Sequence, residues 1–287
     1  MISEYFRPKS VSETLKLLKK WNGKAKLVAG GTNVVPDIRA KASDGEALID
    51  LSYLRNLSYV KEEKKRIRIG ALTSVSEIAS SKVIRKDLTV LAEASRQIGN
   101  PLVRNRATIA GNLADASPAA DSAVPLLVLE ARVVVEKHNA KPKQISIEQF
   151  FVGPNKTVLR RDELIREIVL SKPNPSARTA YSKLGLRNAM AISVVSVGVL
   201  AEMKNGKCNR ARIALGAVAP TPRRAYGVEN LLEGQAVTEE LIDQCCEVIQ
   251  KEIQPITDVR ATLEYRRSMT SVLLKRLLQE LFSQGHV

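Results

Sequence analysis

Two short segments of small residues carry the residue types that bind anions through the backbone. The first is Ala29-Gly30-Gly31-Thr32-Asn33, and the second, about eighty residues later, is Thr108-Ile109-Ala110-Gly111-Asn112. Small side chains leave backbone N–H groups uncovered, and glycine tolerates the positive φ angles that let several N–H groups point at one anion. We therefore predict two loops that hold a diphosphate from both sides.

Neither segment fits the common nucleotide-binding fingerprints. The chain contains no Gly-x-Gly-x-x-Gly, and the first segment does not continue into the Gly-Lys-Ser/Thr of a P-loop. On its own, the first segment is equally well explained as a plain turn after a strand. The second segment favours a ligand, because small residues and polar caps dominate the fourteen positions from Thr108 to Asp121.

Cysteine and histidine offer little chemistry of their own. The spacing of Cys208, Cys245 and Cys246 suits neither a disulfide framework, a zinc site nor an iron–sulfur cluster, and the adjacent pair is typical of reduced thiols in a helix core. His138 and His286 have no neighbours at metal-ligand spacing. Redox chemistry in this chain would therefore need an organic cofactor.

The chain is strongly basic, with a formal net charge of +15 and a pI near 9.8. Such a charge attracts phosphate-rich ligands, acidic proteins or nucleic acid. Aromatic residues make up only 4%, and no RRM, KH or zinc-finger signature is present, which disfavours nucleic-acid binding. The start of the chain lacks a secretory h-region and no apolar run approaches about 20 residues, so we expect a cytoplasmic protein.

The elements that would position the two segments form an α/β lobe and an α+β lobe. Ser10 and Glu13 have the spacing of a capping box before a helix, as do Ser74 and Glu77, and short strands are predicted at 26–29 and 47–51. Further strands are predicted from Arg66, at 131–136 and at 163–170, with helices between them. The division at Pro173 and Pro175 predicts a domain over 1–175, with lobes of about 1–55 and 56–175.

Residues 176–287 are predicted to form a separate domain of antiparallel sheet and helices. Strand patterns at 179–184, 192–203 and 210–218 are followed by helical patterns at 227–232, 238–253 and 265–282. Asn205-Gly206 lies between two strand patterns and is a strong signal for a tight hairpin.

The two small-residue segments together resemble those of the flavin-binding subunit of the molybdenum hydroxylase family, which includes carbon monoxide and xanthine dehydrogenases. The likeness extends through Phe151-Val152-Gly153-Pro154 and Ala219-Pro220-Thr221-Pro222-Arg223 to Tyr265-Arg266-Arg267. It covers essentially the whole chain. The family usually has two glycines where this chain has Ala110-Gly111, so Ala110 would be strained if that position needed a positive φ.

The resemblance implies an α+β fold with a two-lobed FAD-binding domain of the vanillyl-alcohol-oxidase type. Leu27 to Val34 would wrap the diphosphate, with Thr32 adding a hydroxyl donor and Thr108 to Asn112 approaching from the second lobe. Asp121 would accept hydrogen bonds from the adenosine ribose, or would instead cap the helix that follows. The stretch from Leu27 to Val34 includes Val28. Ile98 and Ile165 match positions that line the flavin or its adenine, and Lys183 matches a basic residue near the isoalloxazine. Isoleucines such as Ile98 and Ile165 are more often ordinary core residues than cofactor contacts, and Lys183 is equally typical of a solvated strand residue.

The resemblance also implies a function as the final electron relay of a heteromeric dehydrogenase. Electrons would pass from [2Fe–2S] clusters on a small subunit, which is itself served by a molybdopterin large subunit, to FAD on this chain. The external acceptor stays open among NAD, ferredoxin, quinone and oxygen. The competing interpretations are a stand-alone FAD-dependent oxidoreductase, for which His138 lies too far from both segments, and a basic nucleic-acid-binding module.

Overall fold

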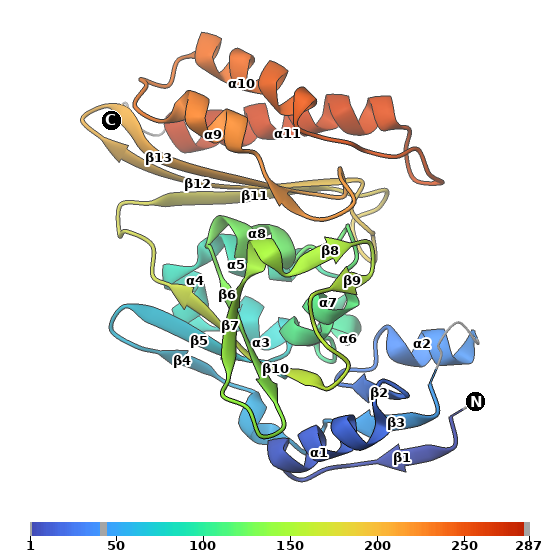
Figure 1. Cartoon of the computed structure of the whole chain (residues 1–287). Helices are drawn as coiled ribbons and strands as arrows, with labels where there is room; N and C mark the ends of the chain where they lie inside the picture. The colour runs from blue at the N-terminus through green and yellow to red at the C-terminus, as the bar shows by residue number, and fades with distance from the viewer. Residues whose placement is uncertain (1, 41–44, 284–287) are drawn as a thin grey trace.

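The computed structural model describes residues 2–40 and 45–283, which form three main sheets with helices around them (Figure 1). The N-terminal part contains a three-stranded parallel sheet in the order β1-β3-β2. Its elements are β1 (Glu4–Phe6), α1 (Val11–Trp21), β2 (Ala25–Val28), α2 (Val34–Arg39) and β3 (Ala47–Asp50). Leu15 and Leu18 of α1 pack on Ile49 of β3, and this contact builds a small core. The strands at 26–29 and 47–51 were predicted within one residue, whereas β1 and α2 were missed.

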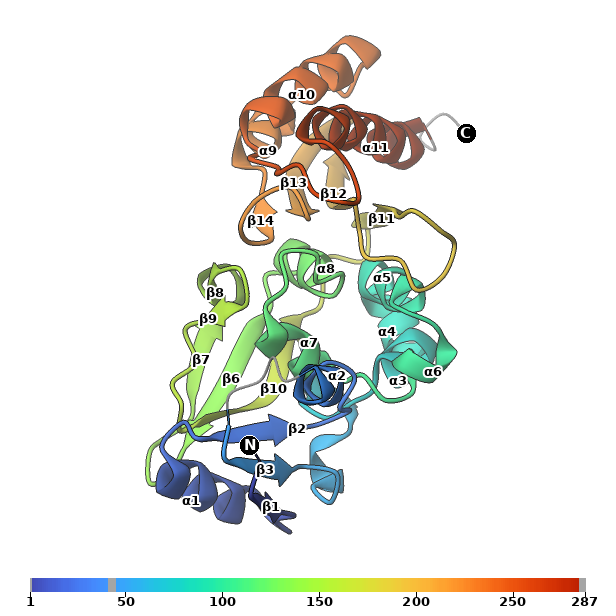
Figure 2. The same ribbon diagram turned by 90° about the vertical axis from the view of Figure 1, so that its right-hand side faces the viewer.

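The second part is a five-stranded sheet, in the order β4-β5-β10-β6-β7, with a layer of helices on one side. Its strands are β4 (Val60–Glu62), β5 (Arg66–Gly70), β6 (Arg132–Lys137), β7 (Lys143–Ser146) and β10 (Glu163–Ser171), with a small ribbon of β8 (Phe151–Gly153) and β9 (Lys156–Thr157). The helices are α3 (Val75–Ser80), α4 (Lys82–Asp87), α5 (Thr89–Gln97), α6 (Pro101–Arg104), α7 (Ile109–Asp115) and α8 (Ala123–Val128). Figure 2 shows these helices beside the five-stranded sheet, with α5 and α8 next to the C-terminal part.

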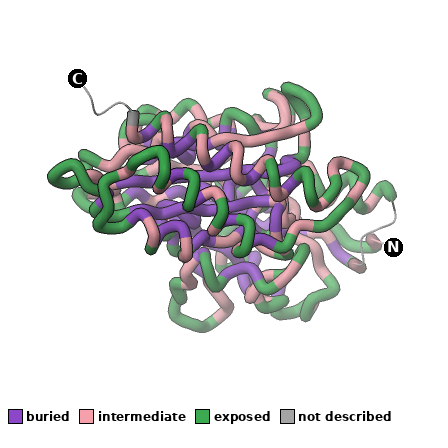
Figure 3. Tube along the Cα trace, turned by 90° about the horizontal axis from the view of Figure 1, so that it is seen from above, coloured by how far each residue is buried: buried purple, intermediate pink, exposed green. Residues whose placement is uncertain are grey.

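The C-terminal part is a four-stranded antiparallel sheet, in the order β11-β12-β13-β14, whose outer face is covered by three helices (Figure 1). The strands are β11 (Arg178–Leu184), β12 (Val195–Lys204), β13 (Lys207–Gly216) and β14 (Arg223–Arg224), and the helices are α9 (Tyr226–Leu232), α10 (Glu239–Lys251) and α11 (Leu263–Ser283). The inner face of the sheet rests on α5 and α8. Buried residues therefore run through the middle of the molecule, with exposed loops around them (Figure 3).

Two local predictions are confirmed at the level of hydrogen bonds. Ser74 and Glu77 form a full capping box at the start of α3. Asn205 and Gly206, with φ angles of 52° and 74°, make a two-residue turn between the paired Lys204 and Lys207. At Ser10 the expectation was only half right, because Glu13 accepts the N–H of Lys9 rather than that of Ser10.

Candidate functional site

The first glycine segment connects β2 to α2 and packs closely against the second lobe. A Cβ added to Gly30 would lie 1.8 Å from the carbonyl oxygen of Arg106 and 3.0 Å from the backbone nitrogen of Ala107. Gly31 has a φ of +73°, which L side chains rarely adopt. Both glycines are thus required by geometry, one by close backbone approach and the other by its φ angle.

The backbone N–H groups of this segment are available to a ligand. Within residues 2–40 and 45–283, no hydrogen bond is donated by the N–H groups of Gly30 to Asn33 or by the Thr32 hydroxyl. Gly30, Gly31 and Thr32 are half-buried and Asn33 is exposed, so these four successive N–H groups, beside a close contact between lobes, are accessible to a ligand as well as to water. Leu27, Val28 and Val34 flank this turn and are only half-buried.

The second segment is not the loop that the sequence predicted. Thr108 caps α7, and its Oγ1 accepts the N–H of Gly111 at 3.1 Å. The N–H groups of Ile109 and Ala110 donate to Thr73 and Ala71, and that of Asn112 donates to Thr108. The expectation of uncovered backbone donors from 109 to 112 is therefore wrong. The small residues of this segment allow the capped helix α7 to pack closely against its neighbours. The helix was not predicted, because its apolar residues show no clear helical period.

Ala110 is a normal helical residue. It lies in α7 and is not among the residues with positive φ. The alanine in place of glycine therefore causes no backbone strain, and it packs in the main core.

Asp121 and Lys183 meet in a buried polar cluster. Lys183 Nζ lies 2.6 Å from Asp121 Oδ2, and the two side chains are only 6% and 9% exposed. The Tyr181 hydroxyl donates to Asp121 Oδ1 at 3.1 Å, and the Ser193 hydroxyl donates to the same oxygen. Burial, followed by the nearby Asp121 charge, raises the pKa of Tyr181 well above its usual value. The expectation that Asp121 caps the next helix is wrong, since α8 begins at Ala123 without a side-chain cap.

The ion pair bears on two roles that the resemblance implied, for Asp121 at the ribose and for Lys183 near the isoalloxazine. An adenosine ribose and an isoalloxazine lie at opposite ends of an extended FAD. Asp121 and Lys183 are in direct contact, so they can serve only one end of such a cofactor. Tyr181 and Ser193 were missed as site residues. Tyr181 could have been predicted from the sequence, because it lies two residues before Lys183 and residues two apart on a strand share one face.

A chain of contacts links the two lobes to the C-terminal sheet. Gly30 faces Arg106, two residues before Thr108, and the side chain of Asn112 accepts a hydrogen bond from Ser122, next to Asp121. Lys183 also donates to the carbonyl of Gln97 at 3.2 Å, beside the buried Ile98. Ile165 stands apart from this run, as a core residue of β10. The sequence-predicted residues, Ile165 excepted, thus follow one path across the molecule.

The comparisons with known proteins define the class to which this fold and site belong. Residues 1–173 match the FAD-binding domain in molybdopterin dehydrogenase, and residues 179–281 match the C-terminal domain of carbon monoxide dehydrogenase flavoproteins. The chain belongs to this family of FAD-binding subunits of molybdenum hydroxylases.

Individual relatives agree over nearly their whole length. The chain is 32% identical to the carbon monoxide dehydrogenase medium chain of Hydrogenophaga pseudoflava over 275 residues, covering 96% of this chain and 95% of that protein. It is 28% identical over 286 residues to the nicotinate dehydrogenase FAD-subunit of Eubacterium barkeri, covering 98% and 96%. A solved carbon monoxide dehydrogenase from Hydrogenophaga pseudoflava superposes with a TM-score of 0.95 at 31% identity, covering 99% of this chain and 98% of the matched chain.

The family fixes the class of activity as an oxidoreductase subunit that binds FAD, and the α+β fold prediction is confirmed. Its relatives are medium chains and FAD subunits of multi-subunit dehydrogenases. In the described part of the chain, no helix is both long and apolar enough to cross a bilayer.

Proposed function

We propose that this chain holds FAD between its first two lobes and relays electrons from the [2Fe–2S] clusters of a small subunit to an external acceptor. The observation that carries the proposal is the contact of Gly30 with the Arg106 carbonyl, beside four free backbone N–H groups. This geometry fits a diphosphate, because converging N–H groups bind phosphate oxygens without a positively charged side chain. FAD, when bound, supplies the capacity to accept and pass on electrons.

The residues of the first segment bind the diphosphate. Leu27 to Val34 surround it, with the N–H groups of Gly30 to Asn33 and the Thr32 hydroxyl as donors. The second segment supports this site from across the lobe boundary. Since the N–H groups of 109–112 are already bonded within the protein, Thr108 to Asn112 contribute packing and the Asn112 amide rather than a second set of backbone donors.

Lys183 provides a fixed positive charge near the isoalloxazine, and Asp121 positions it. A cation at this place stabilises negative charge on reduced flavin and so raises its potential. Asp121, held by Tyr181 and Ser193, keeps the Lys183 ammonium in one position in a nearly water-free site. Ile98 lies beside this pair and forms part of the apolar wall. Ile165 lies apart from this pair, in the core of β10, and supports the site only through packing of the second lobe.

We further propose that the partners are an iron–sulfur small subunit and a molybdopterin large subunit, and that the complex is cytoplasmic. The names of the relatives support the proposed partners, because they are subunits of molybdenum hydroxylases. Residues 1–175 would then form the flavin domain, and 176–287 the domain that supplies Lys183 through β11.

The substitution Gly30→Ala tests the site directly. The added methyl would meet the Arg106 carbonyl at 1.8 Å. We expect FAD affinity to fall by at least about tenfold, since overpacking of this kind costs more than one factor of ten in an equilibrium constant. Titration of the apoprotein with FAD, followed by flavin fluorescence, measures the change.

Gly153→Ala is the matched control, because a Cβ there would meet no atom within 4 Å. It should bind FAD as the unmodified chain does. Thr32→Val keeps the shape of the segment while removing the hydroxyl, and should weaken binding without affecting folding. Wild-type FAD affinity in a folded Gly30→Ala protein would refute the proposed site.

A further inference from the structure

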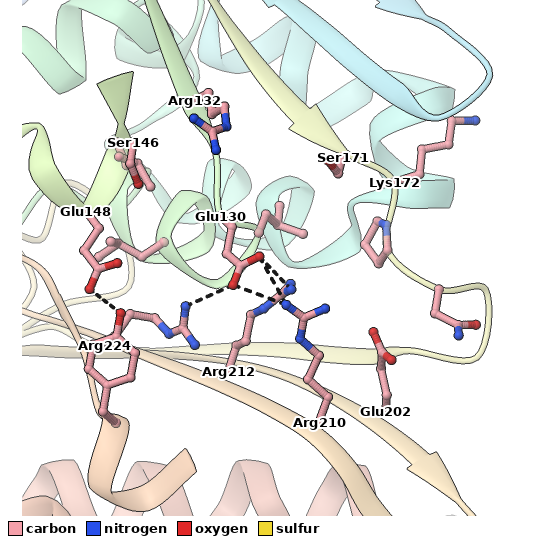
Figure 4. Close-up of a pocket in the computed structure, with 16 residues that line it drawn as sticks. Glu130, Arg132, Ser146, Glu148, Ser171, Lys172, Glu202, Arg210, Arg212 and Arg224 are labelled. Atoms are coloured by element: carbon pink, nitrogen blue, oxygen red, sulfur yellow. Dashed lines mark hydrogen bonds and ion pairs between the residues drawn. The ribbon is translucent and has the colours of Figure 1, made fainter. Parts of the chain in front are cut away.

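A second site lies far from the glycine segments, in a cleft between the five-stranded sheet and the C-terminal sheet (Figure 4). The cleft encloses about 540 Å³. Its walls come from the end of α8, from β6, from the 171–174 connection and from β13. Cavities of this size at domain junctions are typical ligand sites.

Glu130 occupies the centre of this cleft in an uncommon backbone conformation. Its φ is +49°, a region that non-glycine residues seldom adopt. Its carboxylate gathers three arginines from the C-terminal sheet. Arg212 lies at 2.7 Å, Arg210 at 3.3 Å and Arg224 at 3.5 Å. The carboxylate is nevertheless 46% exposed, and so can turn away into solvent.

The arginines have more donor capacity than Glu130 satisfies. Arg212 is 8% exposed, and its buried Nε has no partner among residues 2–40 and 45–283. Arg210 contacts Glu130 only through Nη2, at 3.3 to 3.4 Å. Burial, opposed by Glu130 and reinforced by the charges of Arg210 and Arg224, lowers the pKa of Arg212.

A further cation faces this group from the opposite wall. Arg132, at the start of β6, is exposed and makes no ion pair with a described residue. Figure 4 shows it across Glu130 from Arg210 and Arg212. Arg224, in contrast, is already bound by both oxygens of Glu229 at 2.5 Å, so it belongs to the frame of the site rather than to its free donors.

We propose that this cleft binds the phosphate group of a small anionic molecule, with Arg132, Arg210 and Arg212 as donors and Glu130 as the internal competitor that the ligand displaces. Planar guanidinium groups suit phosphate oxygens through paired hydrogen bonds. In the absence of a ligand, the Glu130 carboxylate occupies the position of the anion and holds the arginines together.

The size of the cleft favours a phosphate carried on an organic group. A volume of 540 Å³ is several times what one phosphate and its nearest waters would fill, given about 30 Å³ for each water. Glu148 and Glu202 also line the cleft, away from Glu130 (Figure 4). They leave room for hydroxyl groups on the ligand and disfavour a second phosphate.

Calorimetric titration of the FAD-loaded full chain with inorganic phosphate and with ribose 5-phosphate tests the proposal. Bound FAD keeps phosphate away from the glycine segment. A failure of the flavin proposal would be observed separately, because the chain would then not retain flavin. We expect saturable binding. Arg210→Gln should weaken it by about tenfold, because one charge-assisted hydrogen bond is lost. Glu130→Gln should tighten it by a similar factor.

The control is Lys207→Gln, which removes an exposed positive charge from the same strand, outside the cleft. It should bind as the unmodified chain does. Tighter binding of ribose 5-phosphate than of phosphate would identify an organic phosphate as the ligand, and the reverse would identify free phosphate. The proposal is overturned if neither binds, if Lys207→Gln weakens binding as much as Arg210→Gln, or if only an oligoglutamate peptide binds.

Discussion

Asp121 is the residue on which the polar cluster beside the proposed flavin site depends. It is the only carboxylate within hydrogen-bonding distance of Lys183 Nζ in the described chain, and both side chains are more than nine-tenths buried. Removing one partner of a buried ion pair leaves an uncompensated charge in a medium of low polarity. Asp121→Asn should therefore destabilise the protein by about 3 kcal/mol, as measured by urea denaturation.

A double-mutant cycle separates the ion pair from the general effect of substitution. Lys183→Met combined with Asp121→Asn should be more stable than the sum of the single changes, because neither charge is then left alone. Asp243→Asn, which breaks an exposed pair with Lys275, should leave stability nearly unchanged. Simple additivity of the two buried changes would contradict the interpretation.

Residue identity could be predicted where backbone geometry demands a single amino acid. Gly30 and Gly31 were recognised because only glycine fits a close backbone contact and a positive φ. The polar cluster was recognised only in part. Ser193 lies 72 residues from Asp121 in the chain, and no local pattern signals a contact at that separation.

At the scale of single elements, β10 carries a buried carboxylate through the middle of the five-stranded sheet. Glu167 is 3% exposed and accepts hydrogen bonds from Arg68 at 2.6 and 2.9 Å and from the Tyr59 hydroxyl at 2.6 Å. Burial alone would raise the pKa of Glu167, but the hydrogen bonds of Arg68 and Tyr59 outweigh it and lower that pKa below 4.5. The ionised form is thus preferred more strongly in the folded state.

This preference has a definite sign in the dependence of stability on pH. A carboxyl group whose pKa is lowered by folding contributes stability above its unfolded pKa, and that stability is lost as the pH falls through the folded pKa. The free energy of unfolding should therefore decline below about pH 5. The substitution Glu167→Gln should lower the free energy of unfolding by about 1–3 kcal/mol at pH 7. In this variant the free energy of unfolding should decline less steeply as the pH falls.

Chemical denaturation between about pH 7 and pH 3 measures this difference. Glu247→Gln, on the exposed face of α10, should keep the slope of the unmodified chain. Equal slopes for Glu167→Gln and the unmodified chain would show that Glu167 has no part in acid sensitivity.

Elements were predictable where local chemistry agrees with tertiary context. The β12–β13 hairpin was recognised from Asn205-Gly206, since both residues tolerate positive φ. The elements α2 and α7 were missed because they are six and seven residues long, too short for a helical period to stand out. Their positions are set by packing between lobes, which no local pattern records.

At the scale of the whole molecule, the helices α5 and α8 join the second part to the C-terminal sheet. The C-terminal sheet buries one face under α9 to α11 and the other on α5 and α8. Lys183 reaches Asp121 across that second contact. The C-terminal part therefore supplies a residue of the proposed flavin site, and its removal should lower the affinity for FAD as well as the stability of the chain.

The net charge of +15 bears on how the chain meets its proposed partner subunits. Opposite charges speed and favour association, and salt screens them over about 10 Å at 0.1 M ionic strength. We expect the association constant of the FAD-loaded chain with the proposed iron–sulfur partner to fall by about tenfold or more when salt rises from about 0.05 to 0.5 M. Surface plasmon resonance across a salt series measures the change. Sucrose at matched osmolality should leave the constant unaltered, because it screens no charge. A constant that stays flat with salt would mean that the excess lysines and arginines face only solvent, and that apolar contacts alone hold the complex together.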